Sequence, residues 1–192
     1  MNTPGENSKP TASTAQVMDG EAINRALRRI AHEVIERNPE LGLVVLAGIP
    51  SRGVEVARRL AEIIQSLSKI AVETGVIDIS MHRDDVGMRV GLPRVQATRL
   101  PLPLAGKTVI IVDDVFHTGR TARAAMDAIT SFGRPARIQL AVLIDRGHRE
   151  LPIRVDYVGK NLPTAPGERV RLRLENVDGE PDAVWLVKET KP

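Results

Sequence analysis

The feature that most constrains the fold is an apolar run that ends in two acids and leads into a turn of Thr and Gly. Residues 107–112 read KTVIIV and are followed by Asp113 and Asp114. Four consecutive Val and Ile residues are typical of a strand buried on both faces, as in a parallel sheet. A helical pattern follows over residues 121–132 and ends at Gly133, a common residue after a helix. A strand, a loop and a helix in this order indicate one unit of an α/β fold.

Neighbouring segments repeat this alternation. Apolar residues recur at helical spacing over residues 22–35, with Asp19 as the predicted cap and Asn38 and Pro39 as the stop. Further strands are predicted at residues 43–47, 76–80 and 137–144, and an amphipathic helix at 54–67. Successive βαβ units predict a central, mostly parallel sheet flanked by helices.

The chain is predicted to be a single domain between two tails. It has 192 residues, of which 42% are hydrophobic and 27% charged, enough for one well-formed core. We interpret residues 1–16 as a disordered tail, 17–189 as the domain and 190–192 as a second tail. After residue 150 the helical period disappears, and short apolar runs predict strands appended to the main sheet, at residues 157–158, 170–174 and 184–187.

One irregular segment, residues 81–105, is too long for an ordinary connection inside a compact domain. It is rich in Arg, Pro and Gly, and we expect a mobile loop or hairpin near a ligand. A dispensable surface insertion is the alternative.

Composition excludes several classes of function. The chain contains no Cys, which excludes thiol nucleophiles, Cys-ligated zinc and iron–sulfur clusters. We expect a cytoplasmic protein that does not enter the membrane, because the sequence shows neither an apolar span nor a secretion signal. The net charge of +3 is too small for bulk binding of nucleic acid, and aromatic residues make up only 2%. Any nucleic-acid binding must therefore use a local basic face.

The loop after the acids fits a phosphate monoester. Residues 118–121 offer successive N–H groups and two hydroxyls at a helix N-terminus, which favours an anion. The adjacent acids would repel that phosphate but can accept hydrogen bonds from sugar hydroxyls, so the pattern predicts a site for a phosphorylated ribose. A Walker-type nucleotide hydrolase is disfavoured. Gly106 and Lys107 could end its phosphate-loop motif, but that motif requires a Gly five residues before Gly106, where this chain has Pro101. An ordinary capped helix beside two solvated acids is the structural alternative.

The residues carry a resemblance to a known family. Residues 109–121 (VIIVDDVFHTGRT) resemble the phosphoribosyl-pyrophosphate (PRPP) signature of type I phosphoribosyltransferases. Four further segments resemble the PyrR family of pyrimidine-operon regulators with uracil phosphoribosyltransferase activity: residues 25–33, 77–85, 145–154 and 156–161. The likeness extends over about residues 17–189.

The resemblance implies a type I phosphoribosyltransferase fold with a small hood and a flexible lid loop. It implies a uracil phosphoribosyltransferase that converts uracil and PRPP to UMP and diphosphate with Mg²⁺ accompanying PRPP, no protein ligand of the metal being assigned. Asp113, Asp114 and Arg83, which lies in the lid, are the implied catalytic residues. The implied substrate-binding residues are Ser51, Arg52, Gly53, Val112, Asp113, Asp114, Val115, Thr118, Gly119, Arg120, Thr121, Asp145 and Arg146.

The resemblance also implies which part of PRPP or uracil each of these residues contacts. The acids would hold the ribose hydroxyls and residues 118–121 the 5′-phosphate. Arg52 would face the leaving diphosphate, although Pro50 stands where the family has a basic residue. The lid would exclude water, with His82 where the family has Tyr. Asp145 and Arg146 would recognise uracil under the hood, or would form an internal salt bridge instead.

The resemblance also implies a second activity. Members bind pyr-operon mRNA when uridine nucleotides such as UMP and UTP are abundant, and they form homodimers or homotetramers. The candidate RNA-binding residues here are Arg28, His32, Arg149, Arg154 and Lys160. Solvated surface charges are the alternative for all five. Two other functions stay open: a phosphoribosyltransferase for another base, and a non-catalytic RNA-binding regulator that retains the nucleotide site.

Overall fold

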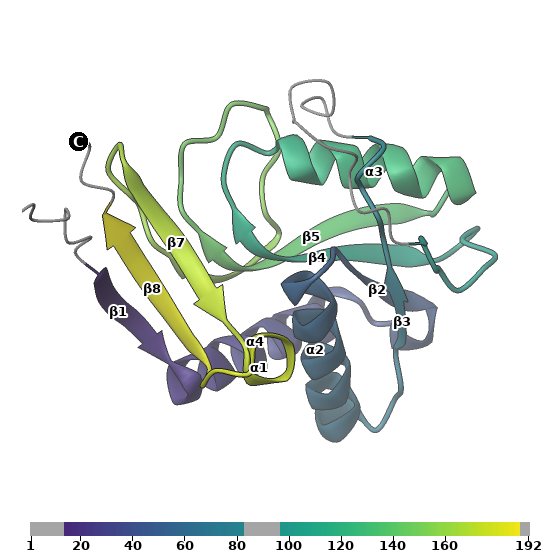
Figure 1. Ribbon diagram of the computed structural model, residues 1–192. Coiled ribbons are helices and arrows are strands. Elements are labelled where there is room, and N and C mark those ends of the chain that lie inside the picture. Colours follow the sequence, from purple (N-terminus) through teal and green to yellow (C-terminus); the bar gives the residue numbers. More distant parts are fainter. Residues whose placement is uncertain (1–13, 83–96, 189–192) are drawn as a thin grey trace, which may run out of the picture.

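The computed structural model describes residues 14–82 and 97–188 (Figure 1). Its helices are α1 (Gly20–Arg37), α2 (Arg52–Ser68), α3 (Arg120–Phe132) and the single turn α4 (Glu175–Asp178), with a 3₁₀ turn at Leu41–Leu43. Its strands are β1 (Thr14–Asp19), β2 (Val44–Gly48), β3 (Glu73–Val76), β4 (Thr108–Phe116), β5 (Arg137–Asp145), β6 (Tyr157–Asn161), β7 (Glu168–Arg173) and β8 (Ala183–Lys188). No helix in these two ranges is both long and apolar enough to cross a membrane.

Five parallel strands form the central sheet, in the order β3-β2-β4-β5-β6. This confirms the predicted parallel sheet. β1, β8 and β7 form a separate antiparallel sheet beside it (Figure 1). Only β6, of the strands predicted after residue 150, joins the main sheet. The prediction that the last two are appended to it is therefore wrong: they pair with each other and with β1 instead.

Helices cover both faces of the central sheet, which buries the apolar run of β4 completely. Successive strand residues point to opposite faces. Ile110 and Val112 pack in the cluster that contains the apolar faces of α1 and α2, whereas Val109 and Ile111 pack with α3. Figure 1 shows the same division, with α3 on one side of the sheet and α1 and α2 on the other. All four β4 residues are at most 1% exposed.

The first helix begins and ends where its sequence signals predict. The Asp19 carboxylate accepts a hydrogen bond from the Ala22 N–H at 2.7 Å, and the buried Asn38 closes the helix by bonding the Val34 carbonyl. A side-chain cap of this kind contributes about 1 kcal/mol to helix stability.

Two boundaries differ from the predictions. The sequence predicts a strand at residues 76–80, but β3 covers Glu73–Val76, because its partner β2 ends at Gly48 opposite Val76. The N-terminal tail is predicted to extend to residue 16, but Thr14 already pairs with Val187 in β1. In both places pairing with a distant strand, and not the local pattern, sets the boundary.

The long irregular segment returns to the sheet at its C-terminal end. Arg99 exchanges two backbone hydrogen bonds with Val76, at 2.8 and 2.9 Å. Arg83, with most of the predicted lid, lies outside the described residues.

Candidate active site

Three loops meet at the carboxyl edge of the central sheet. β2, β4 and β5 are parallel neighbours, so the loops that follow them share one edge. The Ile49 N–H donates to the Val112 carbonyl at 2.9 Å, and the Arg146 N–H donates to the Phe116 carbonyl at 3.0 Å. Both outer loops are thus fastened to the end of β4. Open parallel sheets bind ligands in the crevice at this edge.

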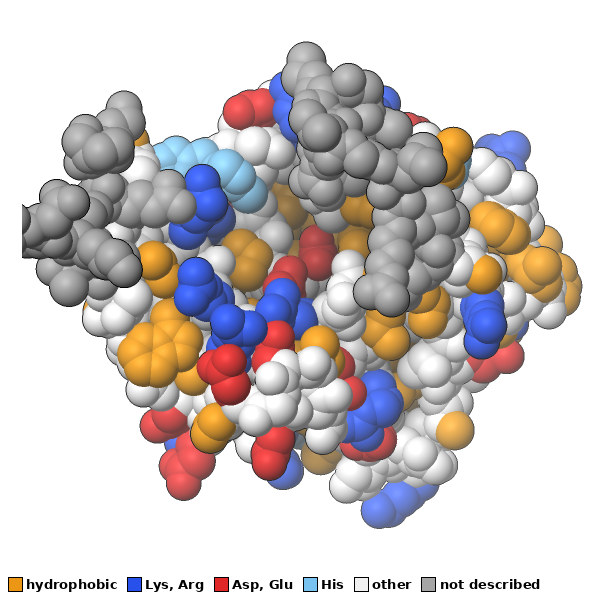
Figure 2. Space-filling model, viewed as in Figure 1, with side chains coloured by type: hydrophobic (Ala, Val, Ile, Leu, Met, Phe, Trp, Pro, Cys, Tyr) orange, Lys and Arg blue, Asp and Glu red, His pale blue; other side chains and the backbone are white. Residues whose placement is uncertain are grey.

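A cavity of about 220 Å³ opens at this edge. Its polar lining comes from Asp113, His117 and the loop that begins α3, and its apolar lining from β4, β5 and neighbouring residues. The lining residues are Ile49, Asp113, Val115, Phe116, His117, Thr118, Gly119, Arg120, Thr121, Ala122, Leu140 and Val142. Figure 2 shows the corresponding face hollowed near its centre, with acidic side chains inside the hollow and basic ones beside it. Six predicted substrate-binding residues therefore lie together around one cavity.

Gly119 shapes the predicted phosphate loop. It is the residue before α3 and has φ +95°, a conformation that residues with a side chain rarely adopt. The Thr118 carbonyl accepts hydrogen bonds from the N–H groups of Glu150 and Leu151, at 3.0 and 3.2 Å. Arg120 pairs with the Glu150 carboxylate at 2.9 Å. This loop is fixed by its own backbone and by the segment after β5.

The two acids lie in different surroundings. Asp113 lines the cavity on the α3 side. Asp114 is close enough to the start of α2 for its charge to add to the hydrogen bond from Asp178 in raising the pKa of Arg52. Each carboxylate also accepts the N–H of the next residue, at 2.9 and 2.8 Å, which fixes its direction. Both side chains are half-buried.

The predicted diphosphate loop packs directly on β4. A Cβ on Gly53 would lie 2.5 Å from the Val112 carbonyl oxygen, so only Gly allows the first turn of α2 to approach this closely. Ser51 is exposed. The Arg52 guanidinium makes a two-pronged contact with Asp178 of α4: its Nε lies 3.0 Å and its Nη2 2.7 Å from the carboxylate oxygens. This pairing holds the pKa of Asp178 at about 2. The sequence pattern did not indicate this partner.

The predicted base-binding residues do not pair with each other. The Asp145 carboxylate accepts the Gly147 N–H at 2.9 Å. The Arg146 guanidinium donates to the Thr164 hydroxyl at 3.3 Å and to the Glu168 carbonyl at 2.9 Å. Burial, and then the charge of Arg169, lowers the pKa of Arg146. The contacts of Arg146 tie the loop after β5 to β7, so the small antiparallel sheet is in the position of the predicted hood.

His117 is a cavity residue that our sequence analysis did not select. Its ring makes an edge-on contact with His148, with 5.9 Å between ring centroids. Partial burial, followed by the charges of Arg146 and His148, lowers its pKa, which favours the neutral ring at neutral pH. Its position inside the predicted phosphate-binding segment was the available signal.

The candidate RNA-binding residues are exposed and lie on several elements. Arg28 and His32 are on α1, and Arg28 lies against α2. Arg149 and Arg154 are in the loop between β5 and β6. Lys160 is on β6, beside α1, and shares a shallow groove with Arg25 and Arg29. The structure brings Lys160 next to α1, where Arg25 and Arg29 also lie. These two arginines are not among the predicted RNA-binding residues.

Metal-ligating side chains do not cluster in the described part of the chain: no group of three or more His, Asp or Glu there could hold an ion. The acidic pair Asp113 and Asp114 is the nearest approach to such a group at the site.

Comparison with known proteins shows the family of the chain. The family described as "Phosphoribosyl transferase domain" matches residues 13–174. The chain is 54% identical over 175 residues to the "Bifunctional protein PyrR" of Roseiflexus sp. (strain RS-1), covering 91% of this chain and 96% of that protein. It is 56% identical over 171 residues to the protein of that name from Chloroflexus aurantiacus, covering 89% and 94%.

Among solved structures the chain is similar to a hypoxanthine phosphoribosyltransferase of Trypanosoma cruzi. The TM-score is 0.70 at 20% identity, and the match covers 91% of this chain and 97% of the other. At this identity the likeness shows the fold alone.

Proposed function

This chain belongs to the phosphoribosyltransferase family and within it to the PyrR proteins, and on that premise we propose that it is a uracil phosphoribosyltransferase that also regulates pyrimidine genes. The reaction converts uracil and PRPP to UMP and diphosphate. One observation carries the proposal: Asp113 and the Gly119 turn at the N-terminus of α3 line the same cavity. A sugar-binding acid beside an anion-binding loop suits a phosphorylated ribose.

In this proposal the 5′-phosphate lies at the start of α3. Thr118, Gly119, Arg120 and Thr121 line the cavity there, and the positive end of the helix faces it. Anchoring the substrate at a group remote from the reacting bond lets binding energy position that bond.

Asp113 and Asp114 hold the ribose. The bond from the anomeric carbon to diphosphate breaks, and positive charge develops on the sugar as the diphosphate leaves. The bond to a ring nitrogen of uracil forms, and the proton of that nitrogen is released to the leaving diphosphate or to solvent. Carboxylates close to the sugar stabilise that charge more strongly as it grows. Because Asp113 lines the cavity and the charge of Asp114 reaches Arg52, we assign to Asp113 the ribose hydroxyls in the cavity and to Asp114 the side of the ribose next to the diphosphate.

The diphosphate lies against the loop between β2 and α2. Ser51, Arg52 and Gly53 begin α2 there, with Arg52 supplying the positive charge. Mg²⁺ usually binds through one or two carboxylates together with substrate phosphates and water, so Asp114, on the side toward the diphosphate, fits a cation that arrives with PRPP. When bound, Mg²⁺ would neutralise part of the charge on the leaving diphosphate. The proposal also assigns Arg83 and the lid to this part of the reaction, although Arg83 lies outside the described ranges.

The base lies under the hood, next to the loop after β5. Asp145 and Arg146 are fixed there by Gly147, Thr164 and Glu168. We propose that this fixed loop presents polar groups to the edge of uracil. A site built this way rejects a base that leaves those groups unpaired.

The regulatory part of the proposal is binding of pyr-operon mRNA, dependent on uridine nucleotides, by a cytoplasmic homodimer or homotetramer. It rests on the name shared by the relatives and on the exposed basic residues Arg28, His32, Arg149, Arg154 and Lys160. RNA is recognised largely by shape and by backbone contacts, which a modest local set of cations can supply.

The test is to mix the purified protein with PRPP and Mg²⁺, to offer uracil, hypoxanthine, guanine and orotate separately, and to follow diphosphate release. We expect turnover with uracil alone. Turnover with a purine or with orotate would show that the assignment of uracil is wrong. Binding of PRPP without turnover of any base would favour the non-catalytic regulator.

A further inference from the structure

Arg52 is held by an acid from the far end of the chain. The Arg52 guanidinium and the Asp178 carboxylate form two parallel hydrogen bonds, at 3.0 and 2.7 Å, between residues 126 positions apart. The Asp178 side chain is 8% exposed and that of Arg52 31%. Paired contacts of this kind fix the plane of a guanidinium as well as its position.

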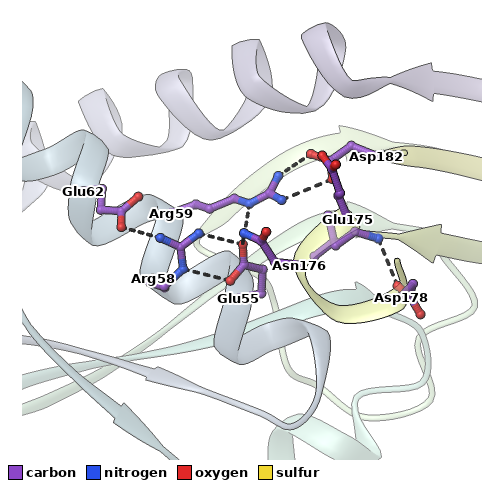
Figure 3. A network of polar contacts seen from close by, with 9 residues as sticks. Glu55, Arg58, Arg59, Glu62, Glu175, Asn176, Asp178 and Asp182 are labelled. Atoms are coloured by element: carbon purple, nitrogen blue, oxygen red, sulfur yellow. Dashed lines mark hydrogen bonds and ion pairs between the residues drawn. The ribbon is translucent and has the colours of Figure 1, made fainter. Parts of the chain in front are cut away.

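Asp178 is itself fixed. Its carboxylate also accepts the Leu174 N–H at 2.9 Å and an Arg173 N–H at 3.1 Å. The α4 turn that carries it is joined to α2 by a second group of polar contacts (Figure 3), in which Asn176 donates to Glu55 at 2.8 Å and Arg59 pairs with Asp182. Asp178 therefore cannot follow Arg52 to a new position without disturbing α4.

The geometry leaves Arg52 able to bind an anion. A guanidinium has five N–H groups, and Asp178 takes one from Nε and one from Nη2. Among the described residues no hydrogen-bond partner of the Arg52 Nη1 is found. Arg173 also contacts Asp178 and pairs with Glu180 at 3.6 Å, so each of the two arginines has an acidic partner. The Nη1 N–H groups of Arg52 are the part of its fork that can meet a further anion. The next residue, Gly53, packs against the backbone of Val112 and Asp113, which places Arg52 near the acids at the end of β4.

We propose that Asp178 is a positioning residue for phosphoribosyl transfer, which holds the Arg52 fork so that its Nη1 edge meets the diphosphate of PRPP. This inference rests on the proposed function. It makes the α4 turn part of the diphosphate site, although Asp178 itself does not touch the substrate.

The direction in which Asp178→Asn changes the affinity for PRPP distinguishes a positioning role from a competing one. If Asp178 only competed with the diphosphate for Arg52, Asp178→Asn would remove the competitor and tighten PRPP binding. If Asp178 positions Arg52, the same change releases the side chain and weakens binding, although it makes the site more positive. A charge-assisted pair of hydrogen bonds is worth about a tenfold change in affinity or more.

The experiment measures the dissociation constant of PRPP with Mg²⁺ by titration calorimetry, in the absence of base, together with KM for PRPP and kcat. For Asp178→Asn we expect both the dissociation constant and KM to rise about tenfold, while kcat changes less than about threefold. Asp178→Glu keeps the charge on a longer side chain, and we expect a rise of only about two- to threefold. Should Asp178→Asn fail to fold, Asp178→Glu carries the test, and an affinity equal to that of the wild type would then overturn the inference.

Glu180→Gln is the matched control. Glu180 lies two residues beyond Asp178, and its carboxylate is 3.6 Å from Arg173, but it forms no ion pair with Arg52 among the described residues. Its removal deletes the same charge from the same segment, so PRPP affinity should stay within about twofold of the wild type. Equal weakening in both variants, or tighter binding by Asp178→Asn, would overturn the inference. If the wild type does not bind PRPP at all, the proposed function fails first.

Discussion

The two strand-to-helix loops at the site are built in different ways. The loop between β4 and α3 is fixed by its own backbone, by the positive φ of Gly119 and by neighbours within about thirty residues, as in the Arg120 and Glu150 pair. The loop between β2 and α2 depends on the C-terminal α4 turn, through Arg52 and Asp178. In our proposal the first loop binds chiefly with backbone N–H groups and the second with a side chain. Local sequence therefore specifies the first, whereas a distant segment completes the second.

The largest effect is expected where the two loops meet, at the acids of β4. In the double variant Asp113→Asn and Asp114→Asn we expect transfer to fall about a thousandfold or more, because the groups that stabilise charge on the ribose are lost. The fold should persist, since both side chains are only half-buried. Diphosphate release measures activity and circular dichroism measures folding. Full activity in the folded double variant would refute the role assigned to the acids.

The next effect tests whether the β4–α3 loop depends on its backbone. Gly119→Ala places a Cβ about 3.4 Å from the Leu151 Cβ, in a backbone conformation that costs a residue with a side chain about 1–2 kcal/mol. We expect the N–H groups to move and kcat/KM for PRPP to fall about a hundredfold, since a displacement of about 1 Å at a binding group can have this effect.

Gly106→Ala is the control for Gly119→Ala. Gly106 has a similar φ of +77° in the turn before β4, and no atom lies within 4 Å of its added Cβ. It should lose comparable stability in a urea titration but keep its activity. An equal loss of activity in both variants would mean that general destabilisation, and not the loop, is responsible.

A smaller effect concerns the acid dependence of the contacts of Glu55, which lies on α2 and bonds Asn176 of α4. Hydrogen bonds from Arg58, and further ones from Arg59 and Asn176, lower the pKa of Glu55 from 4.5 to about 2. The folded state thus favours the carboxylate, so its contribution is fully present above about pH 4.5 and is lost as the pH falls toward 2. Between pH 6 and pH 3 the wild type should lose about 2 kcal/mol of unfolding free energy that Glu55→Gln does not lose.

Urea unfolding at the two pH values measures this difference. Glu62→Gln is the control, because Glu62 lies on the same helix and also contacts Arg58 but its side chain is 61% exposed. Glu62→Gln should lose as much unfolding free energy between pH 6 and pH 3 as the wild type does. If Glu55→Gln loses as much stability in acid as the wild type does, the contacts of Glu55 with Arg58, Arg59 and Asn176 are weaker than the geometry implies.

The same comparison explains what the sequence could predict. The cap of α1 at Asp19, the buried run of β4 and the turn at Gly119 are local patterns, and the structure contains all three. The end of β3 at Val76 and the separate sheet of β1, β8 and β7 depend on pairing between distant strands, which local periodicity does not record. The partner of Arg52 depends on that sheet, since α4 connects β7 to β8.

The smallest effect completes the comparison, because each loop carries one Arg paired with an acid. Arg120 and Glu150 are about half exposed, at 50% and 53%, and an exposed pair contributes about 0.5 kcal/mol or less. Glu150→Gln should therefore change the unfolding free energy by no more than this. It should also change the dissociation constant of PRPP less than twofold, since backbone N–H groups carry the binding at this loop. Calorimetry under the conditions used for Asp178→Asn makes the comparison direct. If Glu150→Gln weakens PRPP binding as much as Asp178→Asn does, both loops bind through oriented arginines and the distinction between them fails.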